Sequence, residues 1–268
     1  MAGEKKPSGY WVIFIHGGAW RDPDIDSAFA SATVSELRNS PLCRSVEGLA
    51  SLNYRLSPYT DHPTRPSAAD DCNRNAIHPD HLIDVVTGIE YLQRRFKFGN
   101  RYILLGHSCG ATLAFQTITE KLALSEIHGM ELSYPFPQAI VGVAGLYDLV
   151  LLRDMDPEPP MCQKFLTSAF GSDEDIWKDQ SPVSGDYQSL WSEGRAAVLA
   201  VCREDEYVSP EQSNVMENRL RPWVNQSGRM LKKLVLGGHH DDCWRLGHGL
   251  RTCIEEALAL LLDKAEAE

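Results

Sequence analysis

Residues 102–112 read YILLGHSCGAT, an apolar run followed by a serine between two glycines and then by the start of a helical pattern. The motif G-x-S-x-G, directly after a strand and before a helix, is typical of a nucleophile elbow. Gly106 and Gly110 leave room for a turn so sharp that Ser108 is held in strained backbone geometry, with its hydroxyl above the sheet. Glycine and serine are common residues, so the motif also needs partners at the ends of neighbouring strands.

Short β-rich runs alternate with helical patterns along the chain, which predicts the α/β class, with helices on both faces of a mostly parallel sheet. We expect a sheet of about six or more strands. Apolar residues at helical spacing predict a crossover helix over 81–96 and a last helix over 250–262. The predicted strands are residues 10–15, 48–54, 101–105, 138–144, 196–202 and 230–236.

Residues 146–194 interrupt this alternation, because they are rich in Pro, Asp, Gly and Ser and contain short helical patches such as 161–170. Ligands bind outside the carboxyl ends of the strands in open α/β sheets. A long connection there is expected to form a pocket wall or a lid, and a surface loop without a role is the alternative. The 268 residues, 43% of them hydrophobic, predict a single domain over 1–268.

The net charge of −11 would repel both nucleic acid and anionic membrane surfaces, so neither is expected as a partner. The sequence has no apolar run long enough for a membrane span and no signal-peptide pattern near its start. Seven cysteines without a C-x-x-C pair are interpreted as reduced thiols, which predicts a cytoplasmic location. The oligomeric state is not fixed by the sequence, and a homodimer is compatible with it.

The stretch FIHGGAW (14–20) stands at the end of the first predicted strand. Glycine backbone N–H groups can approach a developing oxyanion without a Cβ in the way, so Gly17 and Gly18 are expected to donate to it. The amide of Cys109, directly after the elbow serine, is the expected third donor, and its thiol is expected to have no role. A tight turn without chemistry is the alternative.

A serine nucleophile needs a general base, and a third group must orient that base. The last predicted strand runs into LGGHHDDCW (236–244), where His239 and His240 compete as the base. The preceding strand runs into an acidic loop, and solvated loops without chemistry are the alternative for both stretches. The candidate acids in that loop are Glu204, Asp205 and Glu206.

Taken together, these stretches resemble the hormone-sensitive-lipase-like branch of the α/β-hydrolases, and within it the fungal kynurenine formamidases. HPDHL before the crossover helix and the H-x-D pattern at 240–242 favour the formamidases over esterases at large. The similar stretches are FIHGGAW, NYRLSP (53–58), HPDHLIDVVTGIEYL (78–92), ILLGHSCGA (103–111), GLYDL (145–149), DEYV (205–208) and HDDCW (240–244).

The resemblance implies an α/β-hydrolase fold in which Ser108 is the nucleophile, Asp205 the acid and His240 the base. It implies hydrolysis of N-formyl-L-kynurenine to L-kynurenine and formate through a formyl-enzyme, a step of tryptophan degradation in the kynurenine pathway that leads to NAD. No metal and no organic cofactor is expected.

The expected ligand is a small aromatic amino acid, so a pocket with aromatic walls is expected. Trp20, Tyr147 and Trp244 stand next to the motifs and are the candidates for substrate binding, with core packing as their alternative. Tyr54 and Arg55 are expected to brace the oxyanion loop. Two other functions stay open: a carboxylesterase for small esters with the same triad, and a hydrolase-fold binding module without activity.

Overall fold

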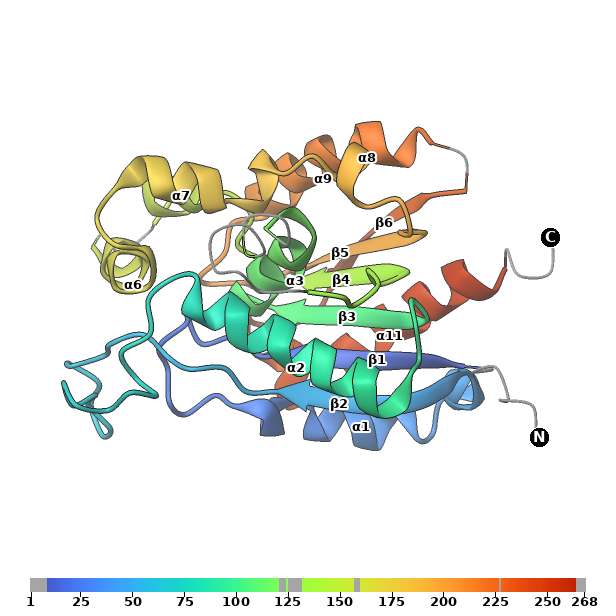
Figure 1. The fold of residues 1–268 in the computed structure, drawn as a ribbon, viewed down its shortest axis with the longest axis horizontal. Coiled ribbons are helices and arrows are strands. Elements are labelled where there is room, and N and C mark those ends of the chain that lie inside the picture. The colour runs from blue at the N-terminus through green and yellow to red at the C-terminus, as the bar shows by residue number, and fades with distance from the viewer. Residues whose placement is uncertain (1–8, 121–123, 125–131, 157–159, 227, 264–268) are drawn as a thin grey trace.

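The protein is described by a computed structural model over residues 9–120, 124, 132–156, 160–226 and 228–263. Six strands form one sheet in the order β2-β1-β3-β4-β5-β6, and every neighbouring pair is parallel (Figure 1). The predicted α/β class and strands are confirmed, with small shifts at the strand ends. The strands are β1 (Tyr10–Ile15), β2 (Val46–Leu52), β3 (Tyr102–His107), β4 (Ala139–Val143), β5 (Ala196–Cys202) and β6 (Met230–Leu236).

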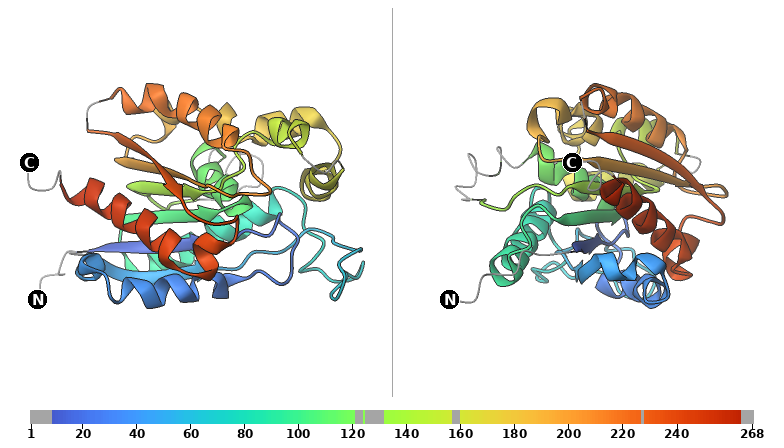
Figure 2. Two further views of the ribbon diagram at one scale, coloured as in Figure 1. Left: turned by 180° about the vertical axis from the view of Figure 1, so that it is seen from behind. Right: turned by 90° about the vertical axis from the view of Figure 1, so that its right-hand side faces the viewer.

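Helices cover both faces of the sheet, as Figure 2 shows from behind and from the side. One face carries α1 (Ser31–Leu37) and α11 (His248–Leu262). The other face carries α2 (Asp80–Phe96), α3 (Cys109–Thr119), α8 (Tyr187–Leu190) and α9 (Glu211–Val224). The predicted crossover and last helices correspond to α2 and α11. Three short elements lie outside the β4–β5 connection: η1 (Ser27–Ala30), η2 (Pro41–Ser45) and α10 (Asp242–Arg245).

The sheet separates two hydrophobic clusters because successive side chains of a strand point to opposite faces. In β1, Ile13 and Ile15 pack toward α2 and α3, whereas Val12 and Phe14 pack toward α11. The central strand β3 is buried along its whole length, which explains why it appears as a continuous apolar run in the sequence. None of the described helices is long and apolar enough to cross a membrane.

The connection between β4 and β5 is built of short helices, of which α6 and α7 extend beyond the carboxyl ends of the strands (Figure 1). Trp177 and Trp191 of this connection are fully buried. The Trp191 ring stacks on Trp223 of α9 at 4.5 Å, and its Nε1 donates to the Pro137 carbonyl at 2.8 Å. The connection is therefore packed into the domain. Its elements are α5 (Leu149–Asp154), α6 (Met161–Phe170), α7 (Glu174–Gln180), η3 (Pro182–Ser184) and α8.

The turn from β3 into α3 lies so close to β1 that side chains are excluded from it. A Cβ on Gly110 would lie 2.3 Å from the Ile15 carbonyl oxygen, and one on Gly106 would lie 2.1 Å from the Gly110 carbonyl oxygen. The steric requirement for small residues in the elbow is confirmed.

We expect Gly110→Ala to destabilise the fold by about 2 kcal/mol or more, because backbone atoms must move to admit the methyl group. For a chain of this size that corresponds to a fall in Tm of roughly 5 °C. Gly237→Ala is the matched control, since a Cβ there has open space around it. Thermal unfolding followed by circular dichroism measures both, and equal melting temperatures would contradict the steric argument.

Candidate active site

The elbow places Ser108 between β3 and α3 with φ +54° and ψ −126°. A positive φ is costly for a residue with a Cβ, so the surrounding packing must impose this conformation. The Ser108 amide donates to the Val143 carbonyl at 2.9 Å, which ties the elbow to the end of β4. The predicted strained turn is confirmed.

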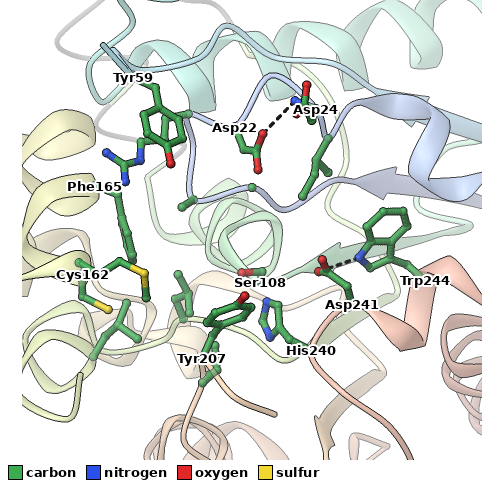
Figure 3. Close-up of a pocket in the computed structure, with 18 of the residues that line it drawn as sticks. Asp22, Asp24, Tyr59, Ser108, Cys162, Phe165, Tyr207, His240, Asp241 and Trp244 are labelled. Carbon is green, nitrogen blue, oxygen red and sulfur yellow. Dashed lines mark hydrogen bonds between the residues drawn. The ribbon is translucent and has the colours of Figure 1, made fainter. Parts of the chain in front are cut away.

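Ser108 opens into a cavity of about 480 Å³, a size typical of small-molecule sites. Figure 3 shows Ser108 and His240 on one side of this cavity and Asp22, Tyr59 and Phe165 facing them. Leu152 of α5 and Phe165 of α6 form part of its wall, so the connection between β4 and β5 contributes to the cavity.

His240 and Asp205 form a buried pair at the ends of β6 and β5. His240 Nδ1 lies 2.9 Å from Asp205 Oδ2 and 3.0 Å from Oδ1, and the two side chains are 7% and 4% exposed. The amides of Tyr207 and Val208 donate to Asp205 Oδ1 at 3.0 and 2.9 Å. The carboxylate is therefore fixed in place, and the pairing leaves the Nε2 of His240 for another partner.

The competing candidates make different contacts. Glu206 Oε2 accepts the His240 amide at 3.0 Å, and Glu204 Oε2 accepts the Gly238 amide at 2.6 Å. The side chain of His239 is 66% exposed, and it does not line the cavity. The two glutamates thus hold the backbone of the histidine loop, while Asp205 holds the imidazole.

His107, inside the G-x-S-x-G motif, is a residue whose role the sequence did not indicate. Its Nε2 donates to the His240 carbonyl at 3.0 Å, and the two rings lie 4.6 Å apart. Burial holds the pKa of His107 well below its usual range, because the charged imidazolium would be desolvated. A neutral His107 therefore holds the backbone of His240 in place through this hydrogen bond. The motif position could not reveal this contact, since the partner lies on a loop far along the chain.

The turn after β1 brings backbone amides next to the elbow. A Cβ on Gly17 would lie 3.1 Å from Ser108 Cβ, and Gly18, with φ +94°, lines the cavity. The Tyr54 hydroxyl donates to the carbonyls of His16 and Gly17 at 3.0 and 3.1 Å. Its ring stacks on His16 at 4.3 Å, and burial lowers the pKa of His16 to about 4. The expected bracing role of Tyr54 is confirmed.

Arg55 does not brace this turn. Its guanidinium pairs with Asp84 at 2.8 Å and with Asp80 at 3.4 Å, both on α2. Arg55 thus fastens the segment after β2 to the crossover helix, because the nearest carboxylates lie there.

The thiol of Cys109 has a contact that the sequence analysis did not assign to it. It accepts the Trp20 amide at 3.2 Å and lies 3.5 Å from the Tyr54 hydroxyl. Burial raises the pKa of this thiol to about 11, so it stays protonated at neutral pH. The expectation that the side chain is without a role is wrong, because it connects the turn after β1 to the elbow.

Of the three aromatic candidates, Trp244 lines the cavity, and its Nε1 donates to Asp241 Oδ1 at 3.0 Å (Figure 3). Trp20 and Tyr147 do not line it. Trp20 packs edge-on against Phe170 at 5.0 Å, and Tyr147 is 1% exposed. Both rings are buried in the core, where large apolar surfaces are most stable. The aromatic surface of the cavity comes instead from Tyr59, Phe165, Tyr207 and Trp244.

Among the residues that the structure describes, two groups of side chains bring donor atoms of the kind that bind metals within 4.8 Å of one another. In the first, His107 and His240 use ring nitrogens for the contacts with the His240 carbonyl and Asp205 described above. In the second, His62 Nδ1 accepts the Arg65 amide at 2.9 Å. The second nitrogen of each ring is not used in these contacts, and His62 Nε2 lies 3.6 Å from Asp22 Oδ1 and from Asp24 Oδ2. The groups are His107, His240 and Asp241, and Asp22, Asp24 and His62.

The sequence of this chain is similar to those of a known family. The BD-FAE family profile matches residues 2–220. The chain is 54% identical to the kynurenine formamidase-like hydrolase fscH of Fusarium equiseti, covering 97% of this chain and 86% of that protein. It is 35% identical to the kynurenine formamidase avaC of Aspergillus versicolor, covering 90% and 86%. It is 31% identical to a kynurenine formamidase of Meyerozyma guilliermondii, covering 94% and 85%.

Solved structures agree on the fold. A hormone-sensitive lipase from a metagenome library superposes with a TM-score of 0.64 at 18% identity, covering 96% of this chain and 80% of that one. Esterase B of Lactobacillus rhamnosis superposes with a TM-score of 0.63 at 16% identity, covering 100% and 82%. With a family profile over most of its length and close fungal relatives over nearly all of it, the chain belongs to the BD-FAE family and to the family of the fungal kynurenine formamidases.

Proposed function

We propose that this protein hydrolyses N-formyl-L-kynurenine to L-kynurenine and formate, with Ser108 as nucleophile, His240 as general base and Asp205 as the group that orients it. The observation that carries the chemistry is the buried Asp205–His240 pair beside an elbow serine in one cavity. The choice of substrate is supported by the relatives named kynurenine formamidase.

In this mechanism Ser108 attacks the formyl carbon while His240 accepts the hydroxyl proton. The tetrahedral oxyanion is bound by the amides of Gly17, Gly18 and Cys109, and the amide of Cys109 also lies at the N-terminus of α3, where the helix dipole favours negative charge. His240 then protonates the departing aniline nitrogen, and water activated by the same imidazole releases formate from the formyl-enzyme. Neither a metal nor an organic cofactor takes part in these steps.

The proposed location, domain organisation and partners of the protein agree with this chemistry. All seven cysteines are free thiols, which supports a reducing, cytoplasmic location. Residues 1–268 act as one hydrolase domain, in which the connection 146–194 serves as a cavity wall. The substrate is a small molecule, with no role for nucleic acid or membrane.

The first test is turnover on two substrate types. We expect kcat/KM for N-formyl-L-kynurenine to exceed that for p-nitrophenyl acetate, because an anilide needs a positioned proton donor whereas an activated ester does not. Activity is expected to survive EDTA. Brisk ester hydrolysis without formamide hydrolysis would favour the carboxylesterase function suggested by the structural neighbours.

Ser108→Ala and His240→Ala are each expected to lower kcat by roughly 10⁶-fold while the fold is kept, since residues of a triad act as a unit. His239→Ala is the control, because its side chain is exposed and is not among those that line the cavity. Steady-state kinetics on the three variants measure the loss of kcat, and circular dichroism checks that the fold is kept. Equal losses in the two histidine variants would refute the assignment of the base.

Asp205→Asn is expected to lower kcat by roughly 10⁴-fold, because the imidazole loses its orientation and the stabilisation of its charged form. Glu206→Gln is the matched control, since its side-chain oxygen can still accept the His240 amide. We expect a small loss there, measured in the same assay. If Glu206→Gln proved the more damaging change, the acid would have to be reassigned.

A further inference from the structure

The cavity carries two neighbouring residues of opposite charge, Arg21 and Asp22, that the proposed chemistry does not use. Resting on the proposed function, we propose that they form a subsite for the zwitterionic end of an α-amino acid substrate. Asp22 binds the ammonium group and Arg21 binds the carboxylate.

Both residues belong to the turn that carries the oxyanion donors. Their amides donate to the Gly18 carbonyl at 2.9 and 2.8 Å. A Cβ on Gly18 would lie 3.1 Å from Asp22 Cβ, so the Asp22 side chain packs directly against the turn. The subsite is therefore fixed relative to Ser108 through the backbone.

Asp22 has one carboxylate oxygen engaged and one directed toward the cavity. Oδ1 accepts the Asp24 amide at 2.9 Å and lies 3.6 Å from His62 Nε2. Within the described part of the chain, Oδ2 has no hydrogen-bond partner, and Figure 3 shows the Asp22 carboxylate facing the cavity. A partly buried carboxylate oxygen gains a strong, charge-assisted bond from an ammonium group.

Arg21 presents its guanidinium without a carboxylate partner among the described residues. It lies over the Tyr59 ring, 3.9 Å from the ring centroid. This stacking fixes the plane of the guanidinium and leaves its N–H groups for a ligand.

The other charges around the cavity are already paired within the protein. Arg245 binds Asp241 at 3.0 Å, and Asp24 binds Arg65 at 3.0 Å. Arg21 and Asp22 are therefore the two charged residues of this cavity whose charges a bound zwitterion would neutralise. An α-amino acid carries both of its charges on one carbon, which fits two adjacent residues of one turn.

Because of its position, the subsite should affect the rate of the chemical step as well as substrate affinity. Binding energy at a remote end of a substrate can be used to orient the reacting group. Because the same turn holds Gly17 and Gly18, occupation of the subsite would also hold the oxyanion donors in place. Loss of either charge should lower kcat as well as raise KM.

Four formanilides test the subsite: N-formyl-L-kynurenine, its analogue without the amino group, its analogue without the carboxyl group, and 2-formamidoacetophenone, which has neither. Asp22→Asn should lower kcat/KM about 10-fold to 100-fold for the two substrates with an ammonium group, the range of a hydrogen bond to a charged group. Arg21→Gln should do the same for the two substrates with a carboxylate. Each variant should treat 2-formamidoacetophenone as the wild type does.

Asp24→Asn and Arg245→Gln are the matched controls, because they remove charges of the same sign that are already paired. We expect both to keep the wild-type ratios among the four substrates. A uniform loss over all four substrates in Asp22→Asn or Arg21→Gln, or an equal shift of the ratios in the controls, would overturn the subsite.

Calorimetric titration with L-kynurenine separates this inference from the proposed function. Binding by the wild type that weakens at least 10-fold in both Asp22→Asn and Arg21→Gln supports the subsite even if N-formyl-L-kynurenine is not turned over. Turnover of N-formyl-L-kynurenine with unchanged ratios in both variants would overturn the subsite and leave the proposed function intact. Absence of any L-kynurenine binding by the wild type would also overturn it.

Discussion

Ser108 can face the cavity because Gly106 and Gly110 let α3 begin against the carboxyl end of β1. The Ile15 and His16 carbonyl oxygens would lie 2.3 and 2.5 Å from a Cβ on Gly110, so the two elements are in direct backbone contact. This contact brings the turn after β1 next to the elbow without any intervening side chain. The juxtaposition of a serine with backbone amides is thus a result of sheet order, in which β1 and β3 are neighbours.

His240 is held by two segments at the carboxyl end of the sheet, the loop after β5 and the last residue of β3. Asp205 and Glu206, after β5, bind its ring and its amide, and His107, at the end of β3, binds its carbonyl. The carboxyl ends of parallel strands meet at this edge, so residues far apart in sequence can fix one side chain. Groups positioned before the reaction need not be reorganised during it, which is the condition for electrostatic catalysis.

The strands and the motifs could be predicted from the sequence because buried parallel strands are continuous apolar runs and the elbow needs glycine. The directions in which side chains point could not be predicted from the sequence. Ala19 and Trp20 adopt φ of +49° and +60°, and this reversal of the chain sends the Trp20 ring into the core although its neighbours line the cavity. Helix α9 was also missed, because its sequence is largely polar and contains Pro222 near its end. The contacts of His107 and Cys109 depend on loops that meet only in the folded chain.

The buried thiol of Cys109 bears on how the protein responds to oxidants and alkylating reagents. Such reagents attack the thiolate, and a thiol with a pKa of about 11 is ionised to about one part in 10⁴ at pH 7. Cys72, by contrast, is exposed. We therefore expect such reagents to modify the exposed Cys72 before Cys109, the buried cysteine beside the elbow serine.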